Sequence, residues 1–221
     1  MDKRRMNAII PSTKQSFYGE TDLAGNRAII ANLERNYGKM IREAAYQNGI
    51  EPALVGTYLF VESRGDINAR NGNTYGLGQV SVATTANTLY NDYKQSRISP
   101  REEELLIGFL GQAAIDTIKK AKADTEILSL FSPQLLYNPN FNILVSVMYF
   151  RRCLDKSHTL GYGLRLDIAI YLYNAGYYKT VPFSTDVDSF LDASIPNTTK
   201  NYIKKVLGTN TPYPDAKQIF G

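Results

Sequence analysis

The chain of 221 residues contains one cysteine, one histidine and no tryptophan. Because Cys153 is the only cysteine, no disulfide can form within one chain, and its apolar surroundings indicate a small core residue. His158 is followed by Thr-Leu-Gly and is expected in a loop. We therefore expect neither a histidine-based triad, nor a Cys/His pair, nor a common zinc site. Any chemistry falls to carboxylates and amides, and no metal or organic cofactor is predicted.

Long apolar runs are also missing, and no stretch reaches the length of a membrane span. The basic start, Met1–Pro11, lacks the apolar core of a signal peptide, so we expect synthesis in the cytoplasm without an export signal. The net charge of +4 reflects 25 basic against 21 acidic residues. No cluster of basic residues is interleaved with aromatics, so nucleic acid is not an expected partner. An anionic polymer such as cell-wall glycan suits this mild excess equally well.

Helical patterns dominate after a polar start, and we expect an all-α protein. The predicted parts are an N-terminal arm or linker over 1–32, a helical domain over 33–210 and a surface tail over 211–221. Loss of periodicity between Gly65 and Gln79 predicts a loop with at most a small β-hairpin near residues 66–80. The expected helices run from about Leu33 to Gly49, Pro52 to Ser63, Pro100 to Ala123, Pro139 to Leu154, Leu166 to Tyr173 and Asn197 to Leu207, with a short one near Asp188–Leu191.

One carboxylate stands where an apolar residue is expected. Leu54, Val55, Tyr58 and Leu59 line one face of the predicted second helix, and Glu62 continues that face. Burial disfavours the charged form of a glutamate and raises its pKa. A carboxylic acid that stays protonated near neutral pH can protonate a glycosidic leaving group. The alternative is a helix-end glutamate that reaches water or pairs with an arginine.

Four sequence motifs in a fixed order carry a resemblance to a known family. Glu62–Gln79 contains Glu-Ser, Asn-Ala and Gly-Leu-Gly-Gln, and Asn138–Ile143 leads to Tyr149. Tyr171–Gly176 reads Tyr-Leu-Tyr-Asn-Ala-Gly, and Pro196–Ile203 reads Pro-Asn-Thr-Thr-Lys-Asn-Tyr-Ile. Together these motifs resemble those of the soluble lytic transglycosylase family, over roughly three quarters of the chain.

The resemblance implies a lysozyme-like helical fold that cleaves the β-1,4 bond between N-acetylmuramic acid and N-acetylglucosamine in peptidoglycan. It implies that Glu62 acts as the single acid and base, leaving a 1,6-anhydromuramic end without a second protein carboxylate. Without a signal peptide or an evident wall-binding module, the chain resembles phage-encoded wall-degrading enzymes more than housekeeping periplasmic ones. A role in the cell wall, and attachment to a virion or secretion apparatus through the N-terminal arm, are therefore expectations.

Further site residues follow from the same resemblance. Amides offer donors and acceptors to sugar substituents, and tyrosines offer apolar faces to sugar rings. Each of the residues named below also has a purely structural explanation, as a helix end, a turn residue, a helix cap or a core aromatic. The predicted substrate contacts are Ser63, Tyr75, Gln79, Tyr173, Asn174 and Tyr202.

The chain departs from the family pattern in ways that leave alternatives open. Gly78 stands where the family has methionine, and the loop before Gly76 is one residue shorter. Asp66 stands where asparagine is frequent, and could position a water, which would make the protein a hydrolytic muramidase using Glu62 with Asp66. Asp66 also suits a turn. A third alternative is a non-catalytic wall-binding component of a virion or secretion apparatus.

Overall fold

The computed structural model describes residues 26–182 and 194–221, which are mostly helical and include one two-stranded antiparallel sheet. The predicted all-α class with a small hairpin is thus confirmed. The short helix expected near residues 188–191, and nearly all of the predicted N-terminal arm, fall outside the described residues. Within the described part of the chain, no helix combines the length and apolarity needed to cross a bilayer.

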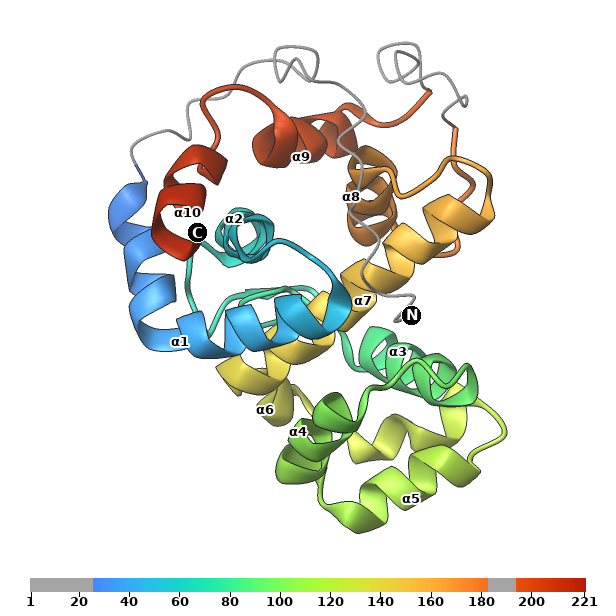
Figure 1. Cartoon of the computed structure of the whole chain (residues 1–221). Helices are drawn as coiled ribbons and strands as arrows, with labels where there is room; N and C mark the ends of the chain where they lie inside the picture. The colour runs from blue at the N-terminus through green and yellow to red at the C-terminus, as the bar shows by residue number, and fades with distance from the viewer. Residues whose placement is uncertain (1–25, 183–193) are drawn as a thin grey trace.

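Helix α7 (Pro139–Thr159) runs through the middle of the molecule with most of its side chains buried (Figure 1). The Asn138 side chain caps it by accepting hydrogen bonds from the N–H groups of Asn140 and Phe141. Proline at the first helical position needs no hydrogen-bond partner for its nitrogen, so the helix begins where the sequence predicts. The apolar run Phe141–Phe150 is buried, which confirms a central buried helix.

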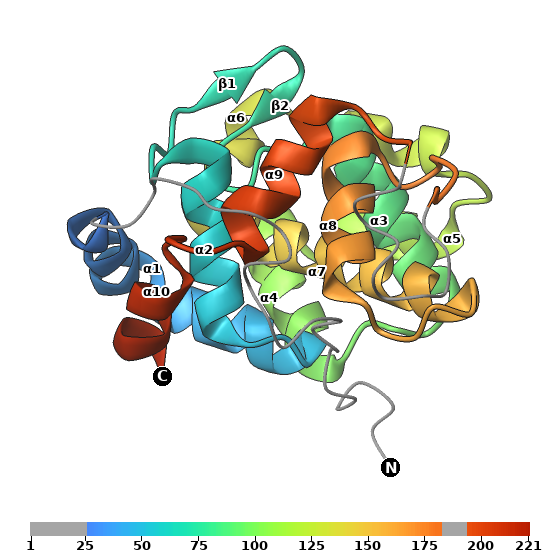
Figure 2. The same cartoon turned by 90° about the horizontal axis from the view of Figure 1, so that it is seen from above.

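Helix α2 (Pro52–Ser63) is seen end-on in the upper part of Figure 1, with other helices around it. It packs against α1 (Arg27–Asn48) and α10 (Tyr213–Phe220), and α8 (Leu166–Ala175) packs along α7. Helix α9 (Asn197–Leu207) contacts both α2 and α8, as the view from above shows (Figure 2). The last turn of α2, where Glu62 lies, is therefore next to an element that comes 140 residues later.

The remaining helices form the lower part of Figure 1. Helix α3 joins them to the rest by packing on α7 and on η2. These elements are α3 (Val82–Lys94), α4 (Pro100–Leu110), α5 (Gln112–Lys120), the 3-10 helix η2 (Asp124–Leu130) and α6 (Pro133–Leu136).

A short hairpin follows α2. Strands β1 (Arg70–Asn71) and β2 (Thr74–Tyr75) pair with Arg70 opposite Tyr75 and Asn71 opposite Thr74. An isolated bridge between Tyr75 and Val80 then leads the chain into α3. The loop that carries the Gly-Leu-Gly-Gln motif is thus closed on itself by backbone hydrogen bonds.

One helix prediction for the middle of the chain was wrong, and one helix there was not predicted. The single helix expected from Pro100 to Ala123 is broken at Gly111, whose φ of 81° and ψ of 157° are accessible to glycine and end α4. Its start is confirmed, because Ser99 and Glu102 form a reciprocal capping box. No helix was predicted over Val82–Lys94, where the structure has α3. It begins at Ser81, whose hydroxyl accepts from the Thr84 N–H.

Three positions near the ends of elements also differ from expectation. Helix α1 begins at Arg27, six residues earlier than expected, and crosses the predicted boundary between arm and domain. His158 lies in the last turn of α7 and not in a loop. The tail was expected at the surface, yet α10 buries Phe220 against Gly56 of α2. Burial of Phe220 in α10 therefore extends the packed structure beyond the predicted domain boundary at residue 210.

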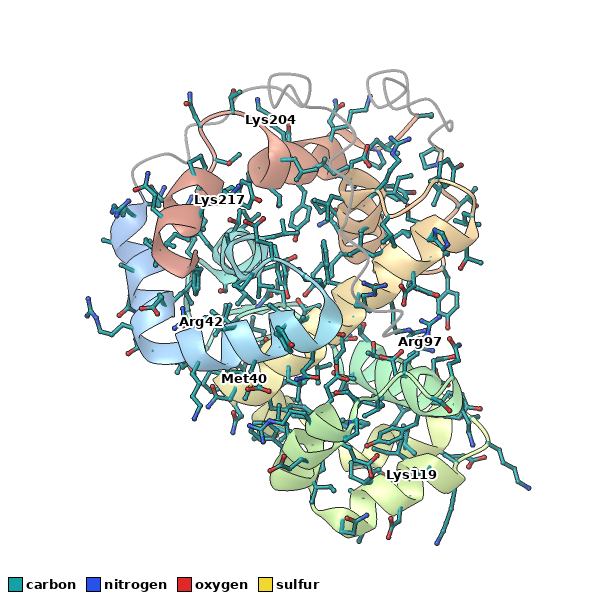
Figure 3. All side chains as sticks on the ribbon, viewed as in Figure 1. Met40, Arg42, Arg97, Lys119, Lys204 and Lys217 are labelled. Atoms are coloured by element: carbon teal, nitrogen blue, oxygen red, sulfur yellow. The ribbon has the colours of Figure 1, made fainter. Side chains whose placement is uncertain are left out.

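Basic residues are distributed over the molecule (Figure 3). The labelled cations lie on α1, on the link between α3 and α4, on α5, on α9 and on α10. These are Arg42, Arg97, Lys119, Lys204 and Lys217. These basic residues do not themselves define one binding face.

Candidate active site

Glu62 lies in the last turn of α2, partly buried, with its carboxylate turned toward α9. Burial raises the pKa of Glu62 from 4.5 to about 7, although a hydrogen bond from Tyr202 opposes this rise. The Tyr202 hydroxyl donates that bond to Oε1 of Glu62. A carboxyl group with a pKa near 7 is populated in both protonation states at neutral pH. It can therefore donate a proton and take one back.

Three tyrosines interact with this carboxylate, Tyr202 through its hydrogen bond and Tyr58 and Tyr173 through the charge of Glu62. Burial raises the pKa of Tyr202 well above its usual value, and the nearby Glu62 charge raises it further. Burial is also the main reason that the pKa values of Tyr58 and Tyr173 are raised, and Glu62 contributes to both. All three phenols therefore stay protonated near neutral pH. The Tyr202 proton is donated to the carboxylate, the Tyr173 proton to the Gly78 carbonyl, and the Tyr58 hydroxyl shares a hydrogen bond with Ser146. None of the three can serve as a base at neutral pH.

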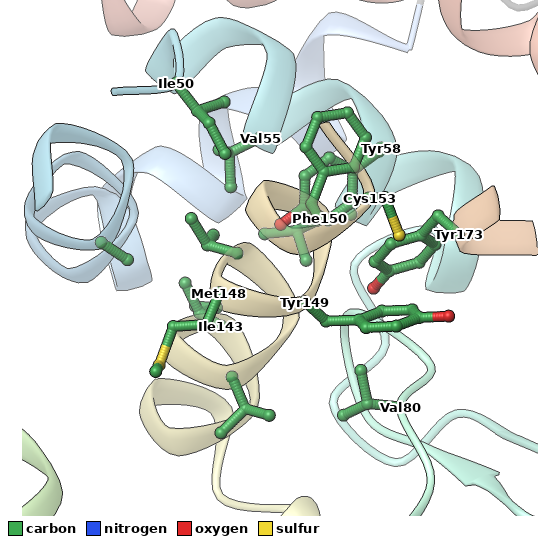
Figure 4. Packing of buried hydrophobic residues seen from close by; sticks show 14 of the residues in the cluster. Ile50, Val55, Tyr58, Val80, Ile143, Met148, Tyr149, Phe150, Cys153 and Tyr173 are labelled. Carbon is green, nitrogen blue, oxygen red and sulfur yellow. The ribbon is translucent and has the colours of Figure 1, made fainter. Parts of the chain in front are cut away.

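The tyrosine rings form a continuous aromatic cluster (Figure 4). The Tyr58 ring lies 5.5 Å from that of Tyr173, and the Tyr149 ring lies 5.0 Å from Tyr173 on its other side. Phe150 stacks on Tyr58 at 5.3 Å with an interplanar angle of 12°. The cluster joins α2, α7 and α8.

Ser63 was predicted as a substrate contact, but its hydroxyl forms hydrogen bonds with the backbone at the C-terminal end of α2. Its hydroxyl donates to the Leu59 carbonyl at 2.9 Å and accepts from the Gly65 N–H at 3.2 Å. Arg64 then ends the helix in the left-handed conformation, with φ of 52°. These contacts assign Ser63 a structural role at the turn that follows Glu62.

The side chain of Gln79 stabilises the hairpin by hydrogen bonds. Its Nε2 donates to the carbonyls of Ala69 at 3.0 Å and Gly76 at 2.8 Å, while its Oε1 accepts from the Thr74 hydroxyl at 2.9 Å. Gln79 has a positive φ of 48°, which is uncommon for a residue with a side chain. The amide donors are therefore directed at the loop backbone, and Oε1 keeps one lone pair for a ligand.

The glycines of this loop allow it to lie against α7. Gly76 has φ of 71°, and a side chain there would meet Asn142 and the Leu136 carbonyl. A Cβ on Gly78 would collide with the side chain of Ser146. This close approach explains why methionine is absent from position 78.

Asn142 holds the same loop in place and was not among the predicted site residues. Its Oδ1 accepts from the Gly78 N–H at 2.7 Å, and its Nδ2 donates to the carbonyls of Tyr75 and Leu136, both at 2.8 Å. The Tyr173 hydroxyl donates to the Gly78 carbonyl at 2.6 Å. The sequence signal for Asn142 was a polar residue inside an apolar helix, since such a residue needs partners when buried.

The remaining predicted residues, Asp66, Asn174 and Tyr75, have surroundings of their own. Asp66 is exposed, and its Oδ1 accepts from the Asn68 N–H at 2.8 Å, which is the turn geometry expected of aspartate. Asn174 is exposed in the last turn of α8. Tyr75 is buried beneath the hairpin, with its ring edge-on to Tyr137 at 5.6 Å. Of the predicted set, Tyr173 and Tyr202 are the ones grouped with Glu62.

No group of three metal-ligating side chains that could hold an ion occurs within residues 26–182 and 194–221. Comparisons of the chain with models of known protein families, with curated proteins and with solved structures found no match.

Proposed function

We propose that this protein is a peptidoglycan lytic transglycosylase with a lysozyme-like fold, in which Glu62 is the single acid and base. The observation that carries the proposal is the placement of Glu62. This carboxyl group at a helix end has its pKa raised by burial to about 7, accepts a hydrogen bond from Tyr202, and is near enough to Tyr58 and Tyr173 for its charge to raise their pKa values. The four ordered sequence motifs supply the substrate class.

The proposed reaction needs one proton relay and no water. Protonated Glu62 gives its proton to the glycosidic oxygen, and the bond from that oxygen to C1 of the muramic acid breaks. The substrate's own acetamido oxygen supports the positive charge that develops at C1. The Glu62 carboxylate then removes the proton from the O6 hydroxyl, and O6 bonds to C1 to close the 1,6-anhydro ring. Glu62 ends protonated, ready for the next cycle.

Tyr202 fits a supporting role in this cycle. Its hydrogen bond stabilises the charged form of Glu62 after the first proton transfer. It also directs Oε1 and leaves Oε2 as the oxygen that faces a substrate. Because the phenol of Tyr202 stays protonated, it does not compete for the proton of O6.

The test is mass spectrometry of the fragments released from purified peptidoglycan sacculi. Wild-type protein is expected to release 1,6-anhydromuramic ends, and Glu62→Gln is expected to release none. Glu104→Gln is the matched control, because Glu104 is an exposed glutamate that pairs with Arg101 at the surface. Reducing muramic ends would instead indicate a hydrolytic muramidase and would direct attention to Asp66. Retained sacculus binding without any Glu62-dependent product would indicate a non-catalytic wall-binding protein.

Action on the cell wall and attachment to a virion or secretion apparatus through residues 1–32 are parts of the same proposal. Most of that segment falls outside the described residues. Deletion of residues 1–25 is expected to abolish incorporation into particles while leaving sacculus cleavage intact. Normal incorporation of the shortened protein would exclude attachment through these residues.

A further inference from the structure

A pocket of about 510 Å³ opens between α3, the start of η2 and the segment that follows α8. Three tyrosines line it, Tyr149, Tyr177 and Tyr178, together with Asn87 and Asp124. Apolar surface with a few fixed polar groups is typical of small-ligand sites. None of these five residues was predicted as part of the site from the sequence.

The pocket borders the aromatic cluster of Tyr58, Tyr149, Phe150 and Tyr173 through the side chain of Tyr149. Tyr149 lines the pocket, and its ring lies 5.0 Å from the Tyr173 ring (Figure 4). Tyr173 is close enough to Glu62 for that charge to raise its pKa. Tyr149 therefore links the pocket to Tyr173, one of the tyrosines that interact with Glu62.

Tyr178 is exposed yet held in place. It is 76% exposed, the largest value among the exposed large hydrophobic side chains of the described residues. Its oxygen accepts a hydrogen bond from Nδ2 of Asn87 at 2.9 Å, and its ring meets that of Tyr177 edge-on at 5.2 Å and 87°. An aromatic face presented to solvent in a fixed orientation can stack on a ligand with little loss of conformational freedom.

Tyr177 is anchored on its other side by two cations. The Arg152 guanidinium and the Lys156 ammonium each lie 4.7 Å from the ring centroid. Lys156 also donates to the Tyr177 carbonyl, and the Tyr177 N–H donates to the Tyr149 hydroxyl at 3.2 Å. The segment that carries Tyr177 and Tyr178 is thus fastened to α7, and the two rings form a rigid platform.

Polar groups flank this platform. Nδ2 of Asn87 also donates to Oδ2 of Asp124 at 2.6 Å, while its Oδ1 accepts from Arg152 at 2.9 Å. Asp124 can accept from a ligand hydroxyl through its second oxygen, and Tyr178 can donate its own hydroxyl proton. Aromatic faces beside one strong acceptor and one donor match a sugar ring, which has apolar C–H faces and hydroxyl edges.

We propose that this pocket is a saccharide subsite, and that it binds one N-acetylated hexose ring of the strand that Glu62 cleaves. The identity of the strand rests on the proposed function, whereas binding of the sugar ring does not. Tyr178 is the stacking residue, and Asn87 is a positioning residue that holds Tyr178 and Asp124. Occupation of this subsite would fix the strand one sugar unit or more away from the bond at Glu62.

The test is calorimetric titration of full-length Glu62→Gln protein with the trimer of β-1,4-linked N-acetylglucosamine. Adding Tyr178→Ala is expected to weaken binding about tenfold, and Tyr178→Phe, which keeps the ring, less than threefold. Tyr46→Ala is the matched control, because Tyr46 is a 67% exposed tyrosine on α1. Equal affinities of the Tyr178→Ala and Tyr46→Ala proteins for the trimer would overturn the proposal.

A second measurement separates this inference from the proposed function. In the protein with Glu62 intact, Tyr178→Ala is expected to raise KM for sacculi about tenfold with little change in kcat. Binding of the trimer that depends on Tyr178, without any Glu62-dependent cleavage, would support the subsite and reject the enzyme. If the protein cleaves sacculi in a Glu62-dependent way, but Tyr178→Ala changes neither KM nor the affinity for the trimer, the enzyme is supported and the subsite is rejected.

Discussion

The Tyr202 hydroxyl donates a hydrogen bond to Oε1 of Glu62, and the two residues are 140 positions apart in the sequence. Tyr202 comes from α9 and Glu62 from α2, two helices that pack against each other. The bond lowers the pKa of Glu62, while burial raises it by more, so the pKa is about 7. The balance between these two opposed effects determines the pH at which the carboxyl group holds a proton.

The proposed role of Glu62 as an acid predicts the pH dependence of kcat/KM. Because the free protein must begin with Glu62 protonated, kcat/KM is expected to fall as pH rises through about 7, by tenfold per pH unit above it. Tyr202→Phe removes the bond that lowers the pKa, so the falling limb is expected to move to higher pH. Initial rates on solubilised glycan strands would measure both profiles. An unchanged limb in Tyr202→Phe would show that another group controls it.

The raised pKa of Glu62 also predicts how stability changes with pH. Folded protein holds a proton on Glu62 up to about pH 7, whereas the unfolded chain releases it near 4.5. Glu62 therefore lowers the free energy of unfolding as pH rises through this window, by up to about 3 kcal/mol. Glu62→Gln lacks this loss, so its stability relative to wild type is expected to increase from about pH 4 to pH 8. Urea unfolding at both pH values checks this, with Glu104→Gln expected to show no such change.

Asn142 provides a test of the contact between the hairpin and α7. Asn142→Leu keeps the side-chain size but leaves the Gly78 N–H and the carbonyls of Tyr75 and Leu136 without their partner. We expect a loss of about 3 kcal/mol in the free energy of unfolding. Asn140→Leu is the control, since Asn140 is exposed on the same helix. Similar melting temperatures for the two variants would contradict the assigned role of Asn142.

Gly78 offers a test of close packing against Ser146. Gly78→Ala is expected to cost about 2 kcal/mol, because the added Cβ collides with the Ser146 side chain. In a Ser146→Gly background the same change is expected to cost less than about 1 kcal/mol, since the colliding atoms are gone. A double-mutant cycle from chemical unfolding measures this coupling. Additive effects would mean that position 78 is limited by something other than Ser146.

Local patterns were sufficient for the elements that carry strong signals. The apolar face of α2, with proline at its first position, predicted both the helix and the inward position of Glu62. Asn138 and Ser99 cap α7 and α4 as expected, because capping depends on residues two or three apart. Helix α3 was missed because threonine and asparagine are weak helix formers, and its packing on α7 and η2 stabilises it instead.

The use of each polar side chain was decided by the tertiary structure. The sequence alone placed Gln79 and Tyr202 in motifs, but did not show that Gln79 is bound to its own loop while Tyr202 reaches Glu62. Asn142 and the ring of Tyr178 had no local signal for their partners, which come from distant segments. Periodicity and capping are short-range effects that a sequence carries by itself. Hydrogen bonds between distant residues, and the burial that raises the pKa of Glu62, exist only once the helices have packed together.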